Sequence, residues 1–304
     1  MVGSSGGNLV DTQKKGNGPA MKFEDIWHDL EKHPRPTRCR KVIKRDWKGF
    51  KERVLENREP FSTMLCASLY AGDVYILQGA FDKDWMLDLR KKTFQYFQSK
   101  PSEFYKMLEG TPDFHRLIDL ESGKKYSFNV CKHSAFFYPW NDDPLDLFPT
   151  VYERWRVIKT LMGLRERQYE TNTPKDGVVD RIQIAQYPSK VGFLEPHSDP
   201  FLHQRLFFSG YMSKRDTDYR QGGFYLVGDN DTVIEAESNI DIGDVGIGYA
   251  TVYHGVSPCD RDLEPDWDTP SGRWFLSMYS NASDEVKDRH TGHPVKLNLP
   301  GVLP

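Results

Sequence analysis

The feature of this sequence that most restricts its fold is a series of short, closely spaced strand patterns in the second half of the chain. Residues 181–187 alternate apolar and polar side chains, which is the period of a strand buried on one face. Further segments of strand character follow, separated by Gly, Asp, Asn and Pro: residues 206–212, 223–227, 232–235, 245–249 and 273–279. Many short strands with such frequent turns favour a sandwich or jelly roll over a parallel α/β sheet.

The first half of the chain, residues 21–170, has a helical or mixed character. Apolar residues at helical spacing predict helices over residues 46–57, 84–98, 101–108 and 144–167. Asp46 stands at the N-cap position of the first of these. The expected architecture is therefore α+β, with a jelly-roll core over residues 181–281 that the helices support, inside a single domain spanning residues 21–304.

Charge and hydropathy exclude several classes of protein. The 304 residues include 41 basic and 44 acidic side chains, a formal net charge of −3, which gives no reason to expect nucleic acid or a membrane as a partner. No run of 18 or more apolar residues is present, so a transmembrane helix is not expected. A Walker loop and a GxSxG elbow are both missing, which removes P-loop nucleotide hydrolysis and serine hydrolysis.

Residues 1–20 lack the apolar core of a secretory signal, and we expect them to be a disordered leader. The four cysteines are scattered and form no CxxC pair. Together these features predict reduced thiols and a cytoplasmic protein. Nothing in the sequence specifies an oligomeric state.

The strongest candidate for chemistry is the tripeptide His197-Ser-Asp199, which is followed by His254. Side chains two residues apart on a strand point to the same face, so His197 and Asp199 can bind one ion together. His254, from a later strand, would complete a facial triad of metal ligands, which leaves about three positions open on an octahedral iron. An HxD tripeptide alone also occurs as a solvated pair at a strand edge, so its sequence context has to decide.

That context resembles the Fe(II)/2-oxoglutarate-dependent dioxygenases. The motifs that carry the resemblance are, in order, YPSKVGFLEPHSD at 187–199, GGF at 222–224, GDV at 243–245, YHGV at 253–256 and GRWFLS at 272–277. In style they are closest to the prolyl-hydroxylase-like branch. The resemblance covers residues 181–281, about a third of the chain, and nothing in the first half matches a family that we can name. It implies that the jelly roll is a double-stranded β-helix of the cupin type.

The resemblance also implies roles in binding the co-substrate. Arg273 would pair with the C5 carboxylate of 2-oxoglutarate, because a guanidinium fork matches a carboxylate bidentately. Ser277, four residues further along the same face, would donate a second hydrogen bond. Tyr187 and Gln183 share a face of the entering strand, from which both can reach the co-substrate.

The spacing between the distal His254 and Arg273 is nineteen residues, longer than is usual in that family. We interpret residues 260–272 as an inserted loop, a lid that carries Trp267. If this segment were instead a strand, the assignment of Arg273 would fail. The candidates for the co-substrate carboxylate would then be Arg205, Arg220 and Arg261.

The implied reaction uses Fe(II), 2-oxoglutarate and O₂ to hydroxylate an unactivated C–H bond of a small molecule, and it releases succinate and CO₂. Because Asp199 occupies the position that must stay open for chloride, halogenation is disfavoured. Desaturation, ring closure and demethylation stay open, since they depend on how the substrate is placed. Three other functions also stay open: a peptidyl or prolyl hydroxylase, a non-redox cupin-like metal-binding protein, and a catalytically silent structural domain.

Overall fold

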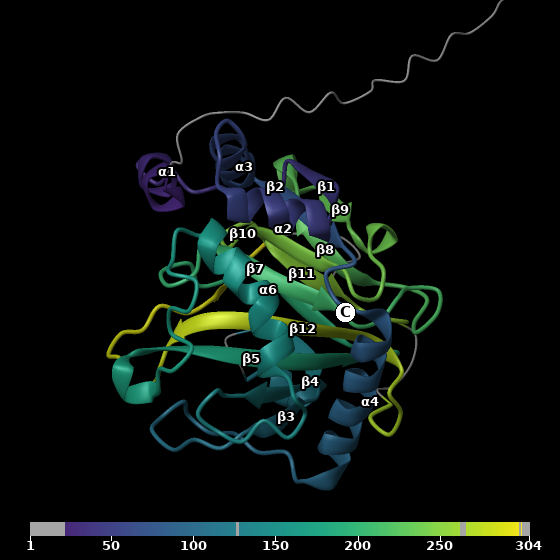
Figure 1. Cartoon of the computed structure of the whole chain (residues 1–304). Coiled ribbons are helices and arrows are strands. Elements are labelled where there is room, and N and C mark those ends of the chain that lie inside the picture. Colours follow the sequence, from purple (N-terminus) through teal and green to yellow (C-terminus); the bar gives the residue numbers. More distant parts are fainter. Residues whose placement is uncertain (1–21, 126–127, 262–265, 298, 300–304) are drawn as a thin grey trace, which may run out of the picture.

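The computed structural model describes residues 22–125, 128–261, 266–297 and 299. Its centre is a curled, mainly antiparallel set of strands, with helices packed along the outside (Figure 1). The larger of its two sheets contains, in spatial order, β1 (Lys41–Asp46), β2 (Asp73–Gln78), β10 (Val245–Tyr249), β7 (Leu206–Tyr211), β12 (Gly272–Ala282), β5 (Val178–Pro188), β4 (Val130–Phe137) and β3 (Phe114–Ile118). All neighbours in it are antiparallel except β1 and β2.

The smaller sheet faces the larger one and shares strand β4 with it. Residues 133–137 of β4 pair with β5, whereas residues 130–131 pair with β6, so the strand connects the two sheets along one edge. The other members are β6 (Phe193–Ser198), β11 (His254–Ser257), β8 (Gly223–Val227), β9 (Val233–Glu235) and β13 (His293–Pro294). The predicted jelly roll is confirmed, and every strand expected from the sequence is present within a few residues of its expected bounds.

Six α-helices lie within the described part of the chain: α1 (Phe23–Leu30), α2 (Trp47–Glu56), α3 (Phe61–Tyr70), α4 (Lys83–Ser99), α5 (Leu120–Gly123) and α6 (Phe148–Leu161). Most of them bury an apolar face against the larger sheet, where Trp27 and Trp155 are completely inaccessible to solvent. The indole of Trp27 also donates a hydrogen bond to the carbonyl of Leu161, 2.6 Å away, which ties α1 to α6. Among the described residues, none of the helices has the length and apolar character needed to cross a membrane.

The helices predicted over residues 46–57 and 84–98 are confirmed as α2 and α4, and the N-cap predicted for the first of them is present. Asp46 accepts a hydrogen bond from the backbone N–H of Gly49 at the start of α2, at 2.8 Å. The helix expected over residues 144–167 is shorter, because it ends at Leu161, just before Gly163 adopts a φ of +76°.

The prediction of a short helix over residues 101–108 is wrong. This segment lies against the edge of β3 instead. Glu103 donates its backbone N–H to the carbonyl of His115 at 2.9 Å, and Leu117 donates to the hydroxyl of Ser102 at the same distance. Tertiary hydrogen bonds to a sheet edge therefore outweigh a weak local helical preference.

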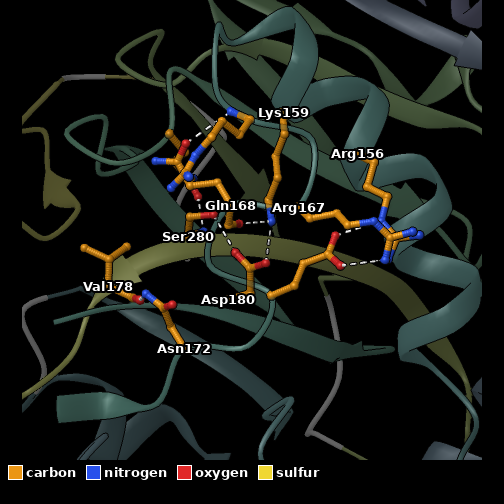
Figure 2. Close-up of polar contacts among 11 residues, drawn as sticks. Arg156, Lys159, Arg167, Gln168, Asn172, Val178, Asp180 and Ser280 are labelled. Atoms are coloured by element: carbon orange, nitrogen blue, oxygen red, sulfur yellow. Dashed lines mark hydrogen bonds and ion pairs between the residues drawn. The ribbon is translucent and has the colours of Figure 1, made fainter. Parts of the chain in front are cut away.

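A buried ion pair fixes α6 to the sheet (Figure 2). The ammonium of Lys159 on α6 lies 2.6 Å from the carboxylate of Asp180 on β5, and both side chains are completely buried. Lys159 also donates to the carbonyl of Gln168, and the hydroxyl of Ser280 on β12 donates to Asp180 at 2.7 Å. Because each charge has a partner and further hydrogen bonds, the pair is tolerated in the core, whereas either charge alone would be costly there.

Candidate functional site

Three side chains converge on one point of the smaller sheet. Strands β6 and β11 are antiparallel neighbours with His254 directly opposite His197, and Asp199 lies just beyond the end of β6. The candidate ligand atoms of these three residues all lie within 4.8 Å of one another. Each imidazole Nε2 is 3.7 Å from a different oxygen of Asp199. The predicted convergence of the triad is confirmed.

Backbone carbonyls fix the orientation of both imidazoles. Nδ1 of His197 lies 3.0 Å from the carbonyl of Glu195, and Nδ1 of His254 lies 2.8 Å from the carbonyl of Val252. Since a carbonyl can only accept, each Nδ1 carries the proton, and each Nε2 presents its lone pair to the metal position. Burial also lowers the pKa of His197 well below its usual range, so this imidazole is neutral.

Burial raises the pKa of the Asp199 carboxyl. A divalent cation at the convergence point would offset this desolvation and hold the carboxylate ionised. Two neutral imidazoles and one carboxylate on one side of an ion are the ligand set of non-haem Fe(II) oxygenases. The residues present therefore fit Fe(II).

The triad forms part of the wall of a cavity of about 350 Å³ between the two sheets. Strands β3, β4, β5, β7 and β12 line it on one side, and β6, β8 and β11 on the other. The chain reaches the cavity again at residues 104–107 and 289–292. A cavity of this size is in the range of small-molecule sites.

Arg273 lies in this cavity, on β12 and directly opposite Tyr187 on β5. Its side chain is 3% exposed, and its Nε donates to the carboxylate of Glu237, which is 2% exposed. Glu237 also accepts the backbone N–H of Phe224 at 2.6 Å. The rings of four aromatic residues lie between 5.6 and 5.8 Å from the guanidinium carbon: Tyr187, Tyr211, Phe224 and Phe275.

Of the other three residues expected to bind the co-substrate, two line the cavity and one does not. Tyr187 and Gln183 line the cavity, and the Gln183 amide donates to the hydroxyl of Ser134 at 3.2 Å. Ser277 does not line the cavity. Its hydroxyl donates to the carbonyl of Phe208 at 2.5 Å, which connects β12 to β7.

Other side chains of the cavity were not identified from the sequence. Lys132 reaches it from β4, and burial lowers the pKa of this ammonium to about 8. Tyr211 does not line the cavity, but its ring lies beside Arg273 and its buried hydroxyl has no hydrogen-bond partner in the described part of the chain. Arg181 enters from β5. Tyr211 and Arg181 belong to predicted strands, so their positions in the alternating pattern could have placed them on the same strand face as the expected site residues. Lys132 lies in the half of the chain that matches no family, so no such signal existed for it.

The alternative arginines lie elsewhere. Arg205 forms an ion pair with Glu31 at 2.9 Å, and Arg220 and Arg261 are exposed. None of the three lines the cavity.

The loop expected to form a lid is described only in part, because residues 262–265 lie outside the described residues. The ring of Trp267 lies 6.3 Å from that of His133, which stacks on Phe97 of α4 on the helix-covered face of the sheet. Trp267 therefore packs on the face opposite the cavity and does not cover it.

Comparison with known proteins gives similarity at the level of structure. No protein-family model matches the sequence, and no curated protein matches it. A prolyl-4-hydroxylase from Pseudomonas putida is 12% identical, covering 68% of this chain and 91% of its own, with a TM-score of 0.42. The thymine-7-hydroxylase of Neurospora crassa, in complex with alpha-KG and thymine, is 16% identical, covering 80% and 85%, with a TM-score of 0.45.

A prolyl hydroxylase from Trichoplax adhaerens, in complex with a hypoxia inducible factor peptide fragment, is 13% identical, with coverage of 78% and 92% and a TM-score of 0.43. Because these identities are below 25% and the TM-scores below 0.5, the chemistry of this chain has to be argued from its own side chains. The chain itself contains both elements that the sequence resemblance implies, a jelly-roll core and a His-Asp-His triad inside it.

Proposed function

We propose that this protein is an Fe(II)- and 2-oxoglutarate-dependent oxygenase that hydroxylates a C–H bond of a small molecule. The observation that carries the proposal is the position of the triad, inside a cavity that also contains a buried arginine suited to a dicarboxylate. When bound, iron and 2-oxoglutarate supply the oxidising chemistry with O₂, and succinate and CO₂ are the co-products.

The triad residues hold the metal from one side. His197 and His254 are held by their Nδ1–H contacts to the backbone, so both Nε2 atoms stay directed at the metal position without further reorganisation. Asp199 is anchored through its backbone N–H, which donates to the carbonyl of Ala250 at 2.9 Å. The opposite side of the metal position faces the cavity, which leaves room for a chelating keto acid and for O₂.

Arg273 binds the far carboxylate of 2-oxoglutarate. Glu237 accepts from its Nε, so the two terminal nitrogens remain for a bidentate contact. The surrounding aromatic rings exclude water, which strengthens these interactions by lowering the local dielectric.

The shape of the cavity favours a small molecule over a peptide. The cavity lies between two sheets, and its volume of about 350 Å³ has to hold both the co-substrate and the substrate. Residues 104–107 form one part of its wall, and residues 289–292 form another. A folded or extended polypeptide needs an open groove instead.

The test uses anaerobic spectroscopy, because the Fe(II)–2-oxoglutarate chelate has a metal-to-ligand charge-transfer absorption that requires no substrate. We expect the wild-type protein to develop this band and, in air, to release succinate. Asp199→Ala should lose both, whereas Asp229→Ala, at an exposed position outside the cavity, should keep both. A normal band in Asp199→Ala contradicts the ligand assignment. Full function with Zn(II) in place of iron supports a non-redox metal protein instead.

A further inference from the structure

The cavity has a second cationic end, far from Arg273. In the antiparallel pair of β5 and β12, Arg273 lies opposite Tyr187 and Tyr279 lies opposite Arg181. Six residues along a strand correspond to roughly 20 Å. The five-carbon chain of 2-oxoglutarate, held between Arg273 and the metal, is far shorter than this. Arg181 is therefore available to a different ligand.

Aromatic rings, and no carboxylate of the described residues, hold the side chain of Arg181. Its guanidinium carbon lies 5.1 Å from the centre of the Phe136 ring and 5.3 Å from that of Tyr279, so two aromatic faces hold the side chain. No ion pair joins it to a carboxylate in the described part of the chain, and its buried Nε has no hydrogen-bond partner there. By contrast, Arg273 pairs with Glu237, and Arg289 pairs with Asp284 at 3.0 Å.

Two further polar groups that line the cavity also have a buried atom without a hydrogen-bond partner among the described residues. Oδ1 of Asn281, two residues beyond Tyr279 on the same face of β12, is buried and makes no hydrogen bond within the described residues. The same is true of Nε2 of His290. Since more than about 90% of buried polar groups are hydrogen-bonded in folded proteins, three such atoms at one end of a cavity indicate a missing polar ligand.

Aromatic side chains line the cavity beside the metal ligands, and three cations besides Arg181 and Arg273 also line it: Arg116, Lys132 and Arg289. The ring of Phe128 lies 5.5 Å from the ring of the metal ligand His197, edge to face. Lys132 reaches the cavity near Tyr187, at 6.0 Å from its ring, and is not within ion-pair distance of any described carboxylate. A ligand that extends from Arg181 towards the metal therefore meets aromatic surface.

We infer that the substrate is a small carboxylic acid with an apolar body, whose carboxylate binds Arg181 at the end of the cavity opposite the 2-oxoglutarate arginine. The inference rests on the proposed function and specifies the substrate of that same site. The guanidinium of Arg181 matches a carboxylate bidentately, and Nε2 of His290 can donate a further hydrogen bond to it, whereas Oδ1 of Asn281 can only accept and would face a donor group of the ligand. The apolar body lies along Phe136 and Phe128, which directs a C–H bond towards the metal.

The experiment uses matched probes that differ only in charge, 4-phenylbutanoate and its neutral amide 4-phenylbutanamide. Each is titrated into the anaerobic Fe(II)–2-oxoglutarate protein, and the perturbation of the charge-transfer band is recorded. We expect the acid to act at a concentration at least tenfold lower than the amide. Arg181→Gln should abolish this difference and leave the half-saturating 2-oxoglutarate concentration within twofold. Arg215→Gln, which removes an ion-paired arginine outside the cavity, should retain the difference.

Three results would each overturn the inference. The first is an equal response, or no response, to the acid and the amide in the wild-type protein. This test does not depend on the folding of any variant. The second is an unchanged preference for the acid in Arg181→Gln. The third is a tenfold loss of 2-oxoglutarate affinity in that variant, which would assign Arg181 to the co-substrate. If no charge-transfer band forms at all, the proposed function fails. Calorimetric titration of the two probes into the metal-free protein then still decides the charge preference.

Discussion

The ion pair of Arg273 and Glu237 allows a test of the co-substrate site that does not depend on the substrate. Both side chains are almost completely buried, at 3% and 2% exposure. In Glu237→Gln the amide oxygen can still accept from the Nε of Arg273 and from the backbone N–H of Phe224, as the carboxylate does. The replacement therefore removes the negative charge and retains the shape and both hydrogen bonds.

Removing one partner of a buried ion pair costs about 3–5 kcal/mol, because the remaining charge is left unpaired. Since glutamine retains both hydrogen bonds, we expect the lower end, about 3 kcal/mol, in the free energy of unfolding of the protein without co-substrate. A bound 2-oxoglutarate supplies a new carboxylate to Arg273. We therefore expect the variant to bind 2-oxoglutarate about tenfold more tightly than the wild type, a gain of about 1.4 kcal/mol.

Urea denaturation measures the first quantity, and titration of the charge-transfer band with 2-oxoglutarate measures the second. Glu235→Gln is the matched control, because its carboxylate pairs with Arg215 at 3.0 Å but is 45% exposed, and it should change stability by less than about 1 kcal/mol. A Glu237→Gln protein as stable as the wild type would refute the electrostatic argument. Tenfold weaker 2-oxoglutarate binding would show that Glu237 acts by orienting Arg273 and not through its charge.

Two further predictions concern the support of the site. Lys159→Met leaves Asp180 buried without its cation and should lower the free energy of unfolding by about 3–5 kcal/mol, and the double variant that also carries Asp180→Leu should recover part of the loss in urea denaturation. Burial lowers the pKa of His133 to about 3, whereas a histidine in the unfolded chain titrates near pH 6.5. Below pH 6.5 the unfolded chain therefore binds a proton that the folded protein does not, and the free energy of unfolding decreases as the pH decreases. Between pH 7.5 and pH 5 this costs about 2 kcal/mol, and His133→Leu should show a pH dependence of stability that is weaker by that amount.

The metal triad could be predicted because short motifs in the sequence specify each of its three residues. The spacing of His197 and Asp199 specifies one strand face, and the ordered motifs around them specify which later strand supplies His254. The strands of the second half could also be predicted, since successive side chains of β5 and β12 point alternately to the cavity and to the helix-covered face. Both faces of β5 are buried, but its cavity face carries Arg181 and Gln183 and its other face Ile182 and Ile184, so the period of two remains visible in the sequence.

The strands of the first half were not predictable for a physical reason. Strand β2 is buried at all but one position and β4 at all but two, so neither shows the period of a strand with one solvated face. Lys132 therefore lies on a strand that gives no periodic signal. Glu237 begins a short 3₁₀ turn in an acidic segment that reads as solvated surface, and only the tertiary fold brings it beneath Arg273.

The second glycine of the GGF motif connects this hidden glutamate to the sequence. Gly223 has a φ of +111°, and a Cβ added there would overlap the side chain of Glu237. Gly223→Ala should therefore displace Glu237 from Arg273 as well as strain the backbone. Gly110→Ala is the matched control, because Gly110 has a φ of +75° but no atom within 4 Å of the added Cβ. Both variants should lose stability, by roughly 1–2 kcal/mol for the backbone strain. Only Gly223→Ala should change the 2-oxoglutarate titration, and an unchanged titration in that variant would mean that Glu237 does not control Arg273.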